Sequence, residues 1–530
     1  MAAAIVAAAL EMAAVAPAVA RDRATAIQPY IELSQVLTAD VQSGDVLTYT
    51  SVAAGIDASI QSRRTSVSIS ARYERQIAWD RKAADADILT GVASAQVALA
   101  PGLTIGGGAL ATRTRSDIRG GAPVFFNGTD RNVSNVYSAY VGPALTTGNG
   151  PIKLGASYQF GYTKVTSPGY STSGLAGTPL DRFDDSTTQV ATATAGFAAN
   201  TIAPFGATLS AAWEREDAGQ LDQLYIGRFV RLDLVLPVAR TVAIEGGVGY
   251  EKIESGARDP LLDADGQPVV DGRGRFATDP ASPRRIAYRT DGLIYDAGIV
   301  WRPSPRTMLE GRVGRGYGSI RYTASLNYAP RPDIGLRIGV YDGIETFGRQ
   351  LRDGIRSLPD TFVNTRDLLA QRFNGCTFGT AGGGASGACL NSVFQSVSTA
   401  TYRARGVDAV LTKTRGQTVL GIGAGYADRR FYGTGGPGFT IDGVSDDSYY
   451  AQAFFSTPVG ANAGISADLF GNYYDSGLAP GIYSIGATGS YYRNFGRLAT
   501  TLSAGIYSFS QEGADDQVSA QALVGARYRF

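Results

Sequence analysis

Apolar and polar residues alternate with a period of two along most of this chain. In residues 65–74 the odd positions are Thr, Val, Ile, Ala and Tyr, whereas the even positions are Ser, Arg and Glu. The same alternation recurs in residues 152–163, 320–328 and 518–530. Neighbouring side chains of a β-strand point to opposite faces. The pattern therefore predicts strands that have one apolar face and one polar face.

The predicted strands are long enough to cross a membrane. Each apolar face runs for about ten residues, which is the length that a tilted strand needs to span a bilayer. Strands of a β-sandwich are usually nearer to five or six residues. The polar face is rich in Gly, Ser and Thr, which suits a crowded barrel interior. We count roughly 22 such segments, within a range of about 18 to 24, and predict an all-β fold: one up-and-down antiparallel transmembrane β-barrel.

The connections between these segments are of two alternating kinds. Short turns on one side and long loops on the other are typical of outer-membrane barrels, in which the short turns face the periplasm. With an even number of strands, both ends of the chain are expected in the periplasm. The short turns are expected at residues 61–64, 101–102, 148–150, 237–239, 302–305, 330–332 and 494–496, and the long loops at about 114–131, 164–185, 254–285, 342–398 and 427–446.

The first twenty residues have the features of a signal peptide. They are mostly Ala, Val, Ile and Leu, and they end in Ala18-Val19-Ala20, an A-x-A cleavage site. Two features depart from the pattern, since no basic residue precedes the apolar region and Glu11 interrupts it. We expect a signal peptide at 1–20 and a single barrel domain at 21–530. Strands begin near Ile27, so no N-terminal plug domain is expected.

The composition excludes several classes of function. The chain has 48 basic and 47 acidic residues, whereas a nucleic-acid partner would favour a clear basic excess. It has no His, which removes Ser/His triads, His metal sites and His general bases. We therefore expect no enzyme, no cofactor and no metal site. The two cysteines, Cys376 and Cys389, are expected to form a disulfide in an oxidising periplasm, where closing so short a loop is worth roughly 3 kcal/mol.

Two stretches resemble known families. The ending Tyr528-Arg529-Phe530, on an alternating strand, resembles the C-terminal signal that the barrel-assembly machinery reads. Residues 301–307, which are Trp-Arg-Pro-Ser-Pro-Arg-Thr, lead into Gly-Arg-Val-Gly-Arg at 311–315. This stretch is similar to the porin families encoded beside exopolysaccharide and exosortase (PEP-CTERM) genes. That resemblance covers perhaps a tenth of the chain, and it implies an outer-envelope barrel with a link to polysaccharide export.

Charged residues on the polar face are the first candidates for a functional site. An anionic solute could bind a basic ladder of Arg312, Arg321 and Arg337 on three successive strands. The more ordinary alternative is pairing with neighbours such as Glu310, because unpaired charges in a crowded wall are costly. The residues predicted to line the lumen are Arg72, Lys153, Arg231, Arg312, Arg321, Arg337, Glu214, Glu245, Glu310 and Asp468.

The long loop at 342–398 is the second candidate. Its residues 364–373 have apolar side chains at helical spacing, and the cysteine pair with a run of glycines follows. A disulfide-pinned loop with an apolar face could fold into the lumen and narrow it. Alternatively, it could form an extracellular cap that packs on other loops. The pattern does not separate these two arrangements.

Three further motifs have ordinary structural readings. The Asp-rich stretch 263–266 hints at calcium, but it lacks the remaining ligands of an EF-hand loop and fits a hairpin turn. The glycines of 421–425 have no following helix and no Lys-Ser/Thr, so they are read as small residues on a strand face. The aromatic residues expected to form girdles at the membrane boundaries are Tyr73, Trp213, Tyr250, Trp301, Tyr322, Tyr328 and Tyr528, while inward Tyr341 is a weak candidate for sugar stacking.

The sequence favours an outer-membrane channel for polar solutes or polysaccharide. The competing class is a loop-sealed structural barrel that acts as an envelope scaffold or as the partner of an export complex. The expected partners are outer-membrane lipid and the barrel-assembly machinery, without nucleic acid. The solute and the oligomeric state are left open by the sequence.

Overall fold

The structure is a computed structural model. It describes residues 24–79, 85–115, 133–148, 150–166, 180–358, 362–367, 369, 372–379, 387–390, 393, 397–435, 441–513 and 515–530. The predicted signal peptide, residues 1–20, lies outside the described residues. No helix in the described part of the chain is both long and apolar enough to cross a membrane.

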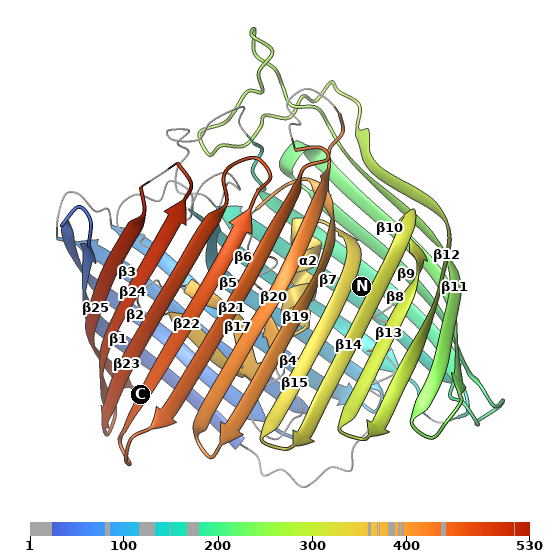
Figure 1. Cartoon of the computed structure of the whole chain (residues 1–530), viewed down its shortest axis with the longest axis horizontal. Coiled ribbons are helices and arrows are strands. Elements are labelled where there is room, and N and C mark those ends of the chain that lie inside the picture. The colour runs from blue at the N-terminus through green and yellow to red at the C-terminus, as the bar shows by residue number, and fades with distance from the viewer. Residues whose placement is uncertain are drawn as a thin grey trace.

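Twenty-two strands form one closed antiparallel ring, as predicted (Figure 1). Each strand pairs with the next along the chain, β15 pairs with β19, and β25 pairs with β1 to close the ring. The strands of the ring are β1 Ala24–Asp40, β2 Val46–Gln61, β3 Thr65–Ala78, β4 Ala86–Ala100, β5 Leu103–Arg115, β6 Val133–Thr146, β7 Lys153–Thr166, β8 Asp185–Phe197, β9 Gly206–Ala218, β10 Gln223–Pro237, β11 Val242–Ala257, β12 Arg285–Ser304, β13 Thr307–Gly316, β14 Ser319–Arg331, β15 Ile334–Glu345, β19 Thr401–Arg415, β20 Thr418–Tyr432, β21 Ser445–Pro458, β22 Ala463–Asp475, β23 Ile482–Phe495, β24 Leu498–Gln511 and β25 Gln517–Arg529.

The alternation along the sequence sorts the side chains between the two faces of this wall. In β10, Arg231 and Asp233 are buried on the inner face, whereas Leu232 and Leu234 are exposed on the outer face. The other strands follow the same rule, which covers the outside of the ring with apolar side chains. In a closed ring the backbone N–H and C=O groups of every strand are hydrogen-bonded to a neighbouring strand, so none needs water. Together with an apolar outer face, this is how strands span an outer membrane. The chain is therefore an outer-membrane β-barrel.

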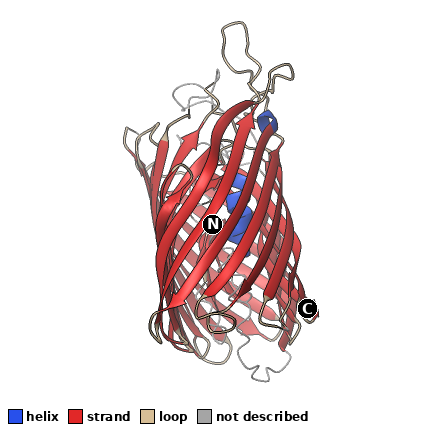
Figure 2. Ribbon diagram, turned by 90° about the vertical axis from the view of Figure 1, so that its right-hand side faces the viewer, coloured by secondary structure: helices blue, strands red, loops and turns tan. Residues whose placement is uncertain are grey.

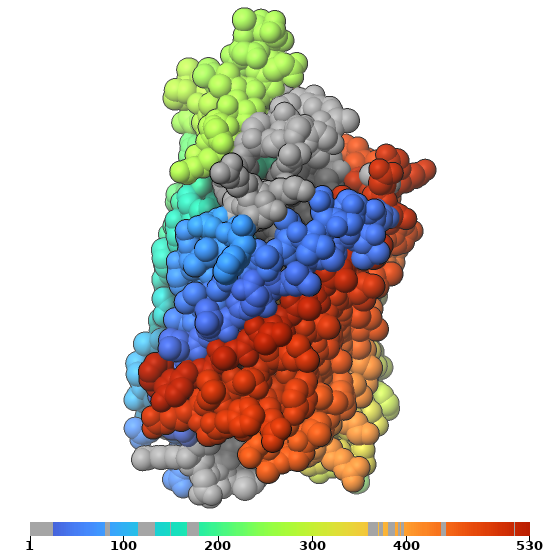
Figure 3. Space-filling view, turned by 90° about the vertical axis from the view of Figure 1, so that its left-hand side faces the viewer, coloured from blue at the N-terminus to red at the C-terminus, as the bar shows by residue number. Residues whose placement is uncertain are grey.

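The two ends of the barrel differ, as the connections predicted. At the lower end in Figure 1 the turns are short, such as the two residues 101–102 between β4 and β5. At the other end, residues 258–284 form a hairpin that rises above the barrel (Figures 1 and 3). This segment has two tight turns, at 263–267 and 271–275. In the first, Asp263 Oδ1 accepts hydrogen bonds from the backbone N–H groups of Asp265 and Gln267, as the turn reading of that motif expects. A 3-10 helix, η1 (Gln220–Asp222), joins β9 to β10 at this end.

The short-turn end carries a strong excess of basic side chains. We consider its turns, the three strand residues on either side of each turn, the first three residues of β1 and the last three residues of β25. Among the described residues of this set, Asp333 is the one acidic side chain. We call its basic residues the basic rim: Arg63, Arg64, Lys153, Arg240, Arg302, Arg306, Arg331, Lys413, Arg415, Arg493, Arg497, Arg527 and Arg529.

The first and last strands meet along a seam (Figure 3). Tyr30 lies opposite Arg529, and the backbone N–H of Phe530 donates to the Pro29 carbonyl at 3.1 Å. The rings of Tyr528 and Phe530 meet edge-on with their centroids 5.4 Å apart, and both side chains are exposed on the outside of the barrel. The residues that resemble an assembly signal thus lie on the closing strand, in an accessible position.

The described residues between β15 and β19 (346–358, 362–367, 369, 372–379, 387–390, 393 and 397–400) form a small folded unit, and we call the segment 346–400 the insert. It contains the helix α2 (Phe347–Arg356) and a three-stranded sheet of β16 (Phe362–Asp367), β17 (Arg372–Gly379) and β18 (Ala388–Cys389). The helix predicted at 364–373 is wrong, because β16 and the start of β17 pair there as antiparallel strands. The real helix precedes that stretch. Its apolar residues Phe347, Leu351 and Ile355 recur every four positions within a polar segment.

Candidate functional site

The helix α2 lies inside the barrel and packs on the inner wall (Figure 2). Phe347, Leu351 and Ile355 are buried in one apolar cluster with residues of the neighbouring strands. The ring of Phe347 meets that of Phe183 edge-on at 5.1 Å. The wall contributes Val92 of β4, Leu110 of β5, Val136 of β6 and Val165 of β7 to this cluster. One end of the insert is therefore held by the hydrophobic effect against β4 to β7.

Polar contacts fix the same helix to the next part of the wall. Arg349 forms an ion pair with Glu214 of β9, and its guanidinium lies 3.9 Å from the ring centroid of Tyr225. The hydroxyl of Tyr402 donates to Gln350 Oε1 at 2.6 Å. Glu214 was predicted to line the lumen, and its partner Arg349 was not foreseen. All of these side chains are buried, so the polar contacts are formed away from water and make the helix position specific.

The disulfide lies on a row of wall glycines. Cys376 and Cys389 are bonded, as predicted, and they join β17 to β18. A Cβ atom added at Gly423 of β20 would stand 2.6 Å from Cys376 Sγ and 2.8 Å from Cys389 Sγ. The ring of Phe378 occupies the corresponding space over Gly421. The alternating glycines of 421–425 therefore provide the room in which this part of the insert sits, and we call Gly421 and Gly423 the glycine seat.

A third contact reaches the seam of the barrel. Leu369 of the insert is buried in a cluster with residues from strands on both sides of the β1–β25 pairing. A Cβ atom added at Gly505 of β24 would lie 2.7 Å from Leu369 Cδ1. The wall residues of this cluster are Val36, Tyr49, Phe470, Tyr507 and Leu523, from β1, β2, β22, β24 and β25.

These contacts place the insert across the lumen. It touches the wall at β4–β9, at β19–β21 and at the seam, which are widely separated parts of the ring. Of the two arrangements that the sequence left open for this loop, the structure has the lumenal one. The insert therefore occupies part of the barrel interior.

The wall of β10–β14 carries a buried ionic cluster. Arg312 contacts Asp233 at 2.7 Å, Glu245 at 2.5 Å and Glu310 at 2.9 Å. Arg231 contacts Asp233 at 2.8 Å and Asp296 at 2.6 Å. A buried Arg with several carboxylates is held by mutual charge compensation. Arg312 is thus paired with Glu310, as the more ordinary reading of the sequence expected.

The proposed basic ladder is not formed. Arg321 lies 3.8 Å from Asp296, so two of its three arginines are engaged by carboxylates. Arg337 is exposed, and it lies on the inner face, opposite the buried Val410 of β19. The local acid–base pairs neutralise Arg312 and Arg321, which the sequence pattern alone would have offered to an anion.

The remaining predicted lumen residues are in two environments. Arg72 is buried and contacts Glu32 at 2.8 Å and Glu74 at 2.9 Å. Asp468 is nearly buried and accepts a hydrogen bond from Gln452 Nε2 at 2.7 Å. Lys153, at the first position of β7, is exposed at the short-turn end. Arg72 and Asp468 therefore have polar partners within the wall, whereas Lys153 is exposed at its short-turn end.

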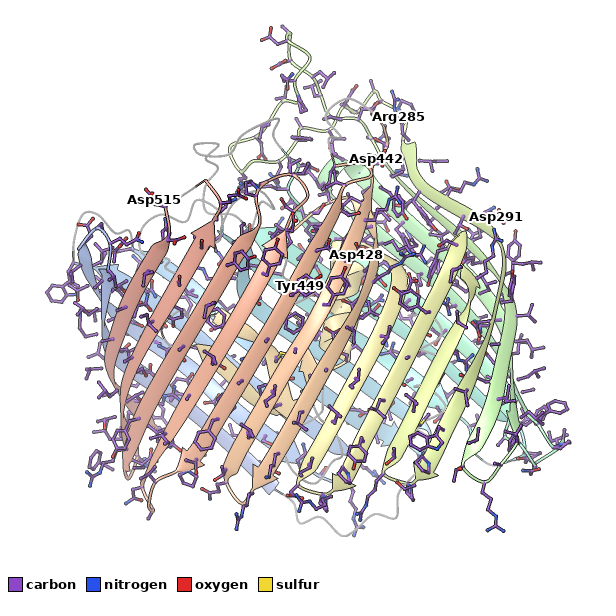
Figure 4. All side chains as sticks on the ribbon, viewed as in Figure 1. Arg285, Asp291, Asp428, Asp442, Tyr449 and Asp515 are labelled. Atoms are coloured by element: carbon purple, nitrogen blue, oxygen red, sulfur yellow. A yellow bond between two sulfur atoms is a disulfide. The ribbon has the colours of Figure 1, made fainter. Side chains whose placement is uncertain are left out.

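Aromatic residues mark the outer face near both ends of the barrel. Among those predicted, Tyr73, Tyr250, Trp301, Tyr322, Tyr328 and Tyr528 are exposed there. Tyr449, labelled in Figure 4, continues this belt with ring contacts to Tyr426 at 4.8 Å and Tyr473 at 6.1 Å. A row of acidic residues lies two positions beyond these tyrosines, toward the long-loop end. In it Asp447 lies opposite both Asp428 and Asp475 on the neighbouring strands. These rows fit an interface between lipid and water.

A polar junction links the insert to the long loops. Asp181 accepts hydrogen bonds from Gln220 Nε2 at 2.6 Å, from the Phe276 backbone N–H at 2.9 Å and from Thr399 Oγ1 at 2.8 Å. The three donors belong to η1, to the projecting hairpin and to the end of the insert. Desolvation raises the pKa of the Asp181 carboxyl to about 7, although its three donors oppose the shift.

Within the described residues, no group of three or more His, Cys, Asp or Glu side chains is arranged to hold a metal ion. The chemistry that the lumen offers is thus that of paired charges, hydroxyls and backbone, which can bind or exclude solutes.

No protein-family model matches the chain, and no curated relative matches its sequence. Among solved structures it is similar to the FrpB iron transporter from Neisseria meningitidis (F5-1 variant), with 10% identity and a TM-score of 0.43 over 95% of this chain and 82% of that one. It is also similar to the ferric-catecholate import receptor Fiu from E. coli K12, with 9% identity and a TM-score of 0.43 over 94% and 81% of the two chains. OmpT, an outer membrane protein of Vibrio cholerae, matches with 10% identity and a TM-score of 0.27 over 96% of this chain and 100% of that one. Similarities this weak assign no function.

Proposed function

We propose that the protein is an outer-membrane channel for polar solutes and that the insert closes its lumen at rest. The observation that carries this proposal is the position of the insert, which crosses the interior and rests on wall glycines. A wide barrel without such an element would leave an aqueous passage. The polar inner face, with its Ser, Thr, Gly and paired charges, suits water and polar solutes.

Opening requires only part of the insert to move. Its α2 end is held by a large apolar cluster and by the Arg349–Glu214 pair. Its disulfide end rests on the glycine seat through apolar contacts of Phe378 and the two sulfurs. The second set of contacts is smaller and lacks a described ion pair, so we assign movement to the disulfide end. The passage would then open between the disulfide end and the wall of β19–β21.

The insert can be removed cleanly because it enters and leaves on neighbouring strands. Glu345 and Tyr402 lie directly opposite each other in the β15–β19 pair. A two-residue Asn-Gly turn can therefore replace residues 346–401 without stretching the wall. In planar bilayers we expect small or infrequent current steps from the intact protein and large, steady steps from the shortened one. Equal conductance of the two proteins would contradict the assignment of the insert as the closing element.

A sealed structural barrel is the second candidate. The extensive burial of α2 in the wall favours it, because a permanently docked helix would act as a filler rather than as a gate. In that case the intact protein stays silent in the bilayer under every condition and only the shortened protein conducts. Polysaccharide as the transported solute rests on the sequence resemblance of residues 301–315 alone, and blockage of the open current by added polysaccharide tests it.

A further inference from the structure

We propose that the outward-facing side chains of the basic rim, among them Lys413, Arg415 and Arg493, bind the anionic headgroups of phospholipids in the periplasmic leaflet of the membrane. The inference is independent of whether the barrel conducts. It starts from an imbalance that the overall composition hides, because the whole chain has a net charge of only +1. Among the described residues, thirteen basic side chains and one acidic side chain stand at the short-turn end, so the described acidic side chains are concentrated elsewhere.

Most charges of the rim are available to a partner. Arg331 contacts Asp333 at 3.4 Å, and Arg527 contacts Glu32 at 2.8 Å. In the described part of the chain, the other eleven rim residues have no carboxylate within ion-pair distance. Lys413 and Arg415 show the arrangement clearly, since both are exposed while Thr412 and Thr414 between and beside them are buried. Exposed, unpaired cations at high density repel one another unless an anion is bound between them.

The depth of the rim points to lipid. Trp301, Phe495 and Phe530 are exposed on the outer face at this end, where aromatic side chains occupy the boundary between hydrocarbon and headgroups. The guanidinium of Arg493 lies 5.1 Å from the ring centroid of Phe495, which is 54% exposed. A cation beside such a ring stands at the depth of lipid phosphates. Lys413 and Arg493 face outward, away from the lumen, and are not placed to guide a solute into it.

The distribution of the rim fits a continuous lipid annulus rather than one docked protein. Its residues come from turns all around the ring, from the β2–β3 turn to the last strand, β25. The long-loop end has the opposite character at its lipid boundary, where Asp428, Asp447 and Asp475 form a row. The barrel thus presents different charges to the two leaflets, as an asymmetric bilayer with anionic phospholipid on one side would favour.

Lipid titration of the purified full-length barrel tests the proposal. The probes are phosphatidylglycerol, phosphatidylethanolamine and inorganic phosphate, and bound molecules are counted by native mass spectrometry. The rim variant carries Gln at Lys413, Arg415, Arg493 and Arg497, and the matched control carries Gln at Arg273, Arg289, Arg315 and Arg430, four exposed arginines of the opposite end. We expect phosphatidylglycerol to bind the wild-type protein more tightly than phosphatidylethanolamine. Each rim charge removed should weaken that binding about fivefold, and the control should match wild type.

Three results would overturn the proposal. They are equal binding of the two lipids, full retention of phosphatidylglycerol by the rim variant, and complete displacement of the lipid by millimolar inorganic phosphate. The last would mean that the rim serves a soluble anion. Gel mobility before and after heating reports whether each variant is folded. If the fourfold variant fails that check, the two double variants, one on β19 and one on β23–β24, are titrated separately.

Discussion

Substitution of Gly423 by Leu should open the channel. A Cβ atom at this position would be 2.6 Å and 2.8 Å from the two disulfide sulfurs, whereas ordinary contacts begin at about 3.4 Å. Even one added carbon requires a shift of at least about 0.8 Å, and Leu adds three more carbons in the same space. Overpacking of this kind costs about 1–3 kcal/mol. Because the wall strand is fixed on both sides by its neighbours, the disulfide end of the insert must move.

That cost converts to a measurable change in population. A destabilisation of about 1–3 kcal/mol multiplies the ratio of undocked to docked insert by about 5- to 150-fold. In planar bilayers the open probability of Gly423→Leu should rise by that factor until it saturates. Gly339→Leu is the matched control, because Gly339 also lies on the inner face but has no atom within 4 Å of its added Cβ. The reasoning fails if Gly423→Leu folds normally and conducts as wild type does, or if Gly339→Leu opens the channel equally.

Three further predictions concern the ionic cluster, the polar junction and the last residue. Arg312→Gln leaves buried carboxylates such as Glu245 without their partner. It should lower the free energy of unfolding by about 3 kcal/mol in a denaturant titration of the refolded barrel. A change below about 0.5 kcal/mol, the effect of a surface substitution, would contradict the pairing. The raised pKa of Asp181 means that its carboxyl is favoured in the neutral form in the folded protein, so its contribution to stability declines as the pH rises from about 4 through about 7. Asp181→Asn should therefore abolish the loss of hydrogen-exchange protection at the Phe276 amide between pH 6 and 8. Phe530→Ala should reduce the amount of folded barrel inserted in cells severalfold without changing the thermal stability of protein refolded in detergent, and equal insertion of both forms would refute a signalling role for that residue.

The architecture of the wall followed from the sequence because one physical rule governs it along the whole length of the chain. Each strand must present apolar side chains to lipid and polar side chains to the interior, and this alternation is visible in any ten-residue window. The pairing of Arg312 with Glu310 was also foreseeable. The two residues are two positions apart on one strand, so they share a face at short range.

The insert followed other rules and was predicted only in part. Its disulfide was evident from two neighbouring cysteines, but its helix was placed wrongly because Leu368 and Leu369 suggested a helical stripe. The true stripe of Phe347, Leu351 and Ile355 is interleaved with Arg349 and Arg352 and is followed by Arg356, so it resembles a solvated segment. The burial of Arg349 depends on Glu214, which is 135 positions earlier in the chain, and no local pattern encodes that distance.

The glycine seat illustrates a more general restriction on what a local sequence pattern can predict. Gly421 and Gly423 obey the alternation of the wall whether or not anything rests on them, since a small residue is acceptable on an inner face in either case. What makes them necessary is the pair of sulfurs and the ring opposite, and these come from a segment more than thirty residues away. Contacts across a lumen produce no repeating pattern in the sequence of the wall strand or of the insert.

The contact of Leu369 with both sides of the seam has a consequence for biogenesis. Val36 and Tyr49 belong to the first two strands, whereas Tyr507 and Leu523 belong to the last two, and one insert side chain touches the cluster that they form. The two edges of the sheet can assemble this cluster only when they meet, and the cluster is complete only when the insert is inside the barrel. Enclosure of the insert and closure of the ring therefore stabilise each other through the same contacts. A barrel that closed with its insert outside would lack these contacts and would be left with a weaker join between its first and last strands.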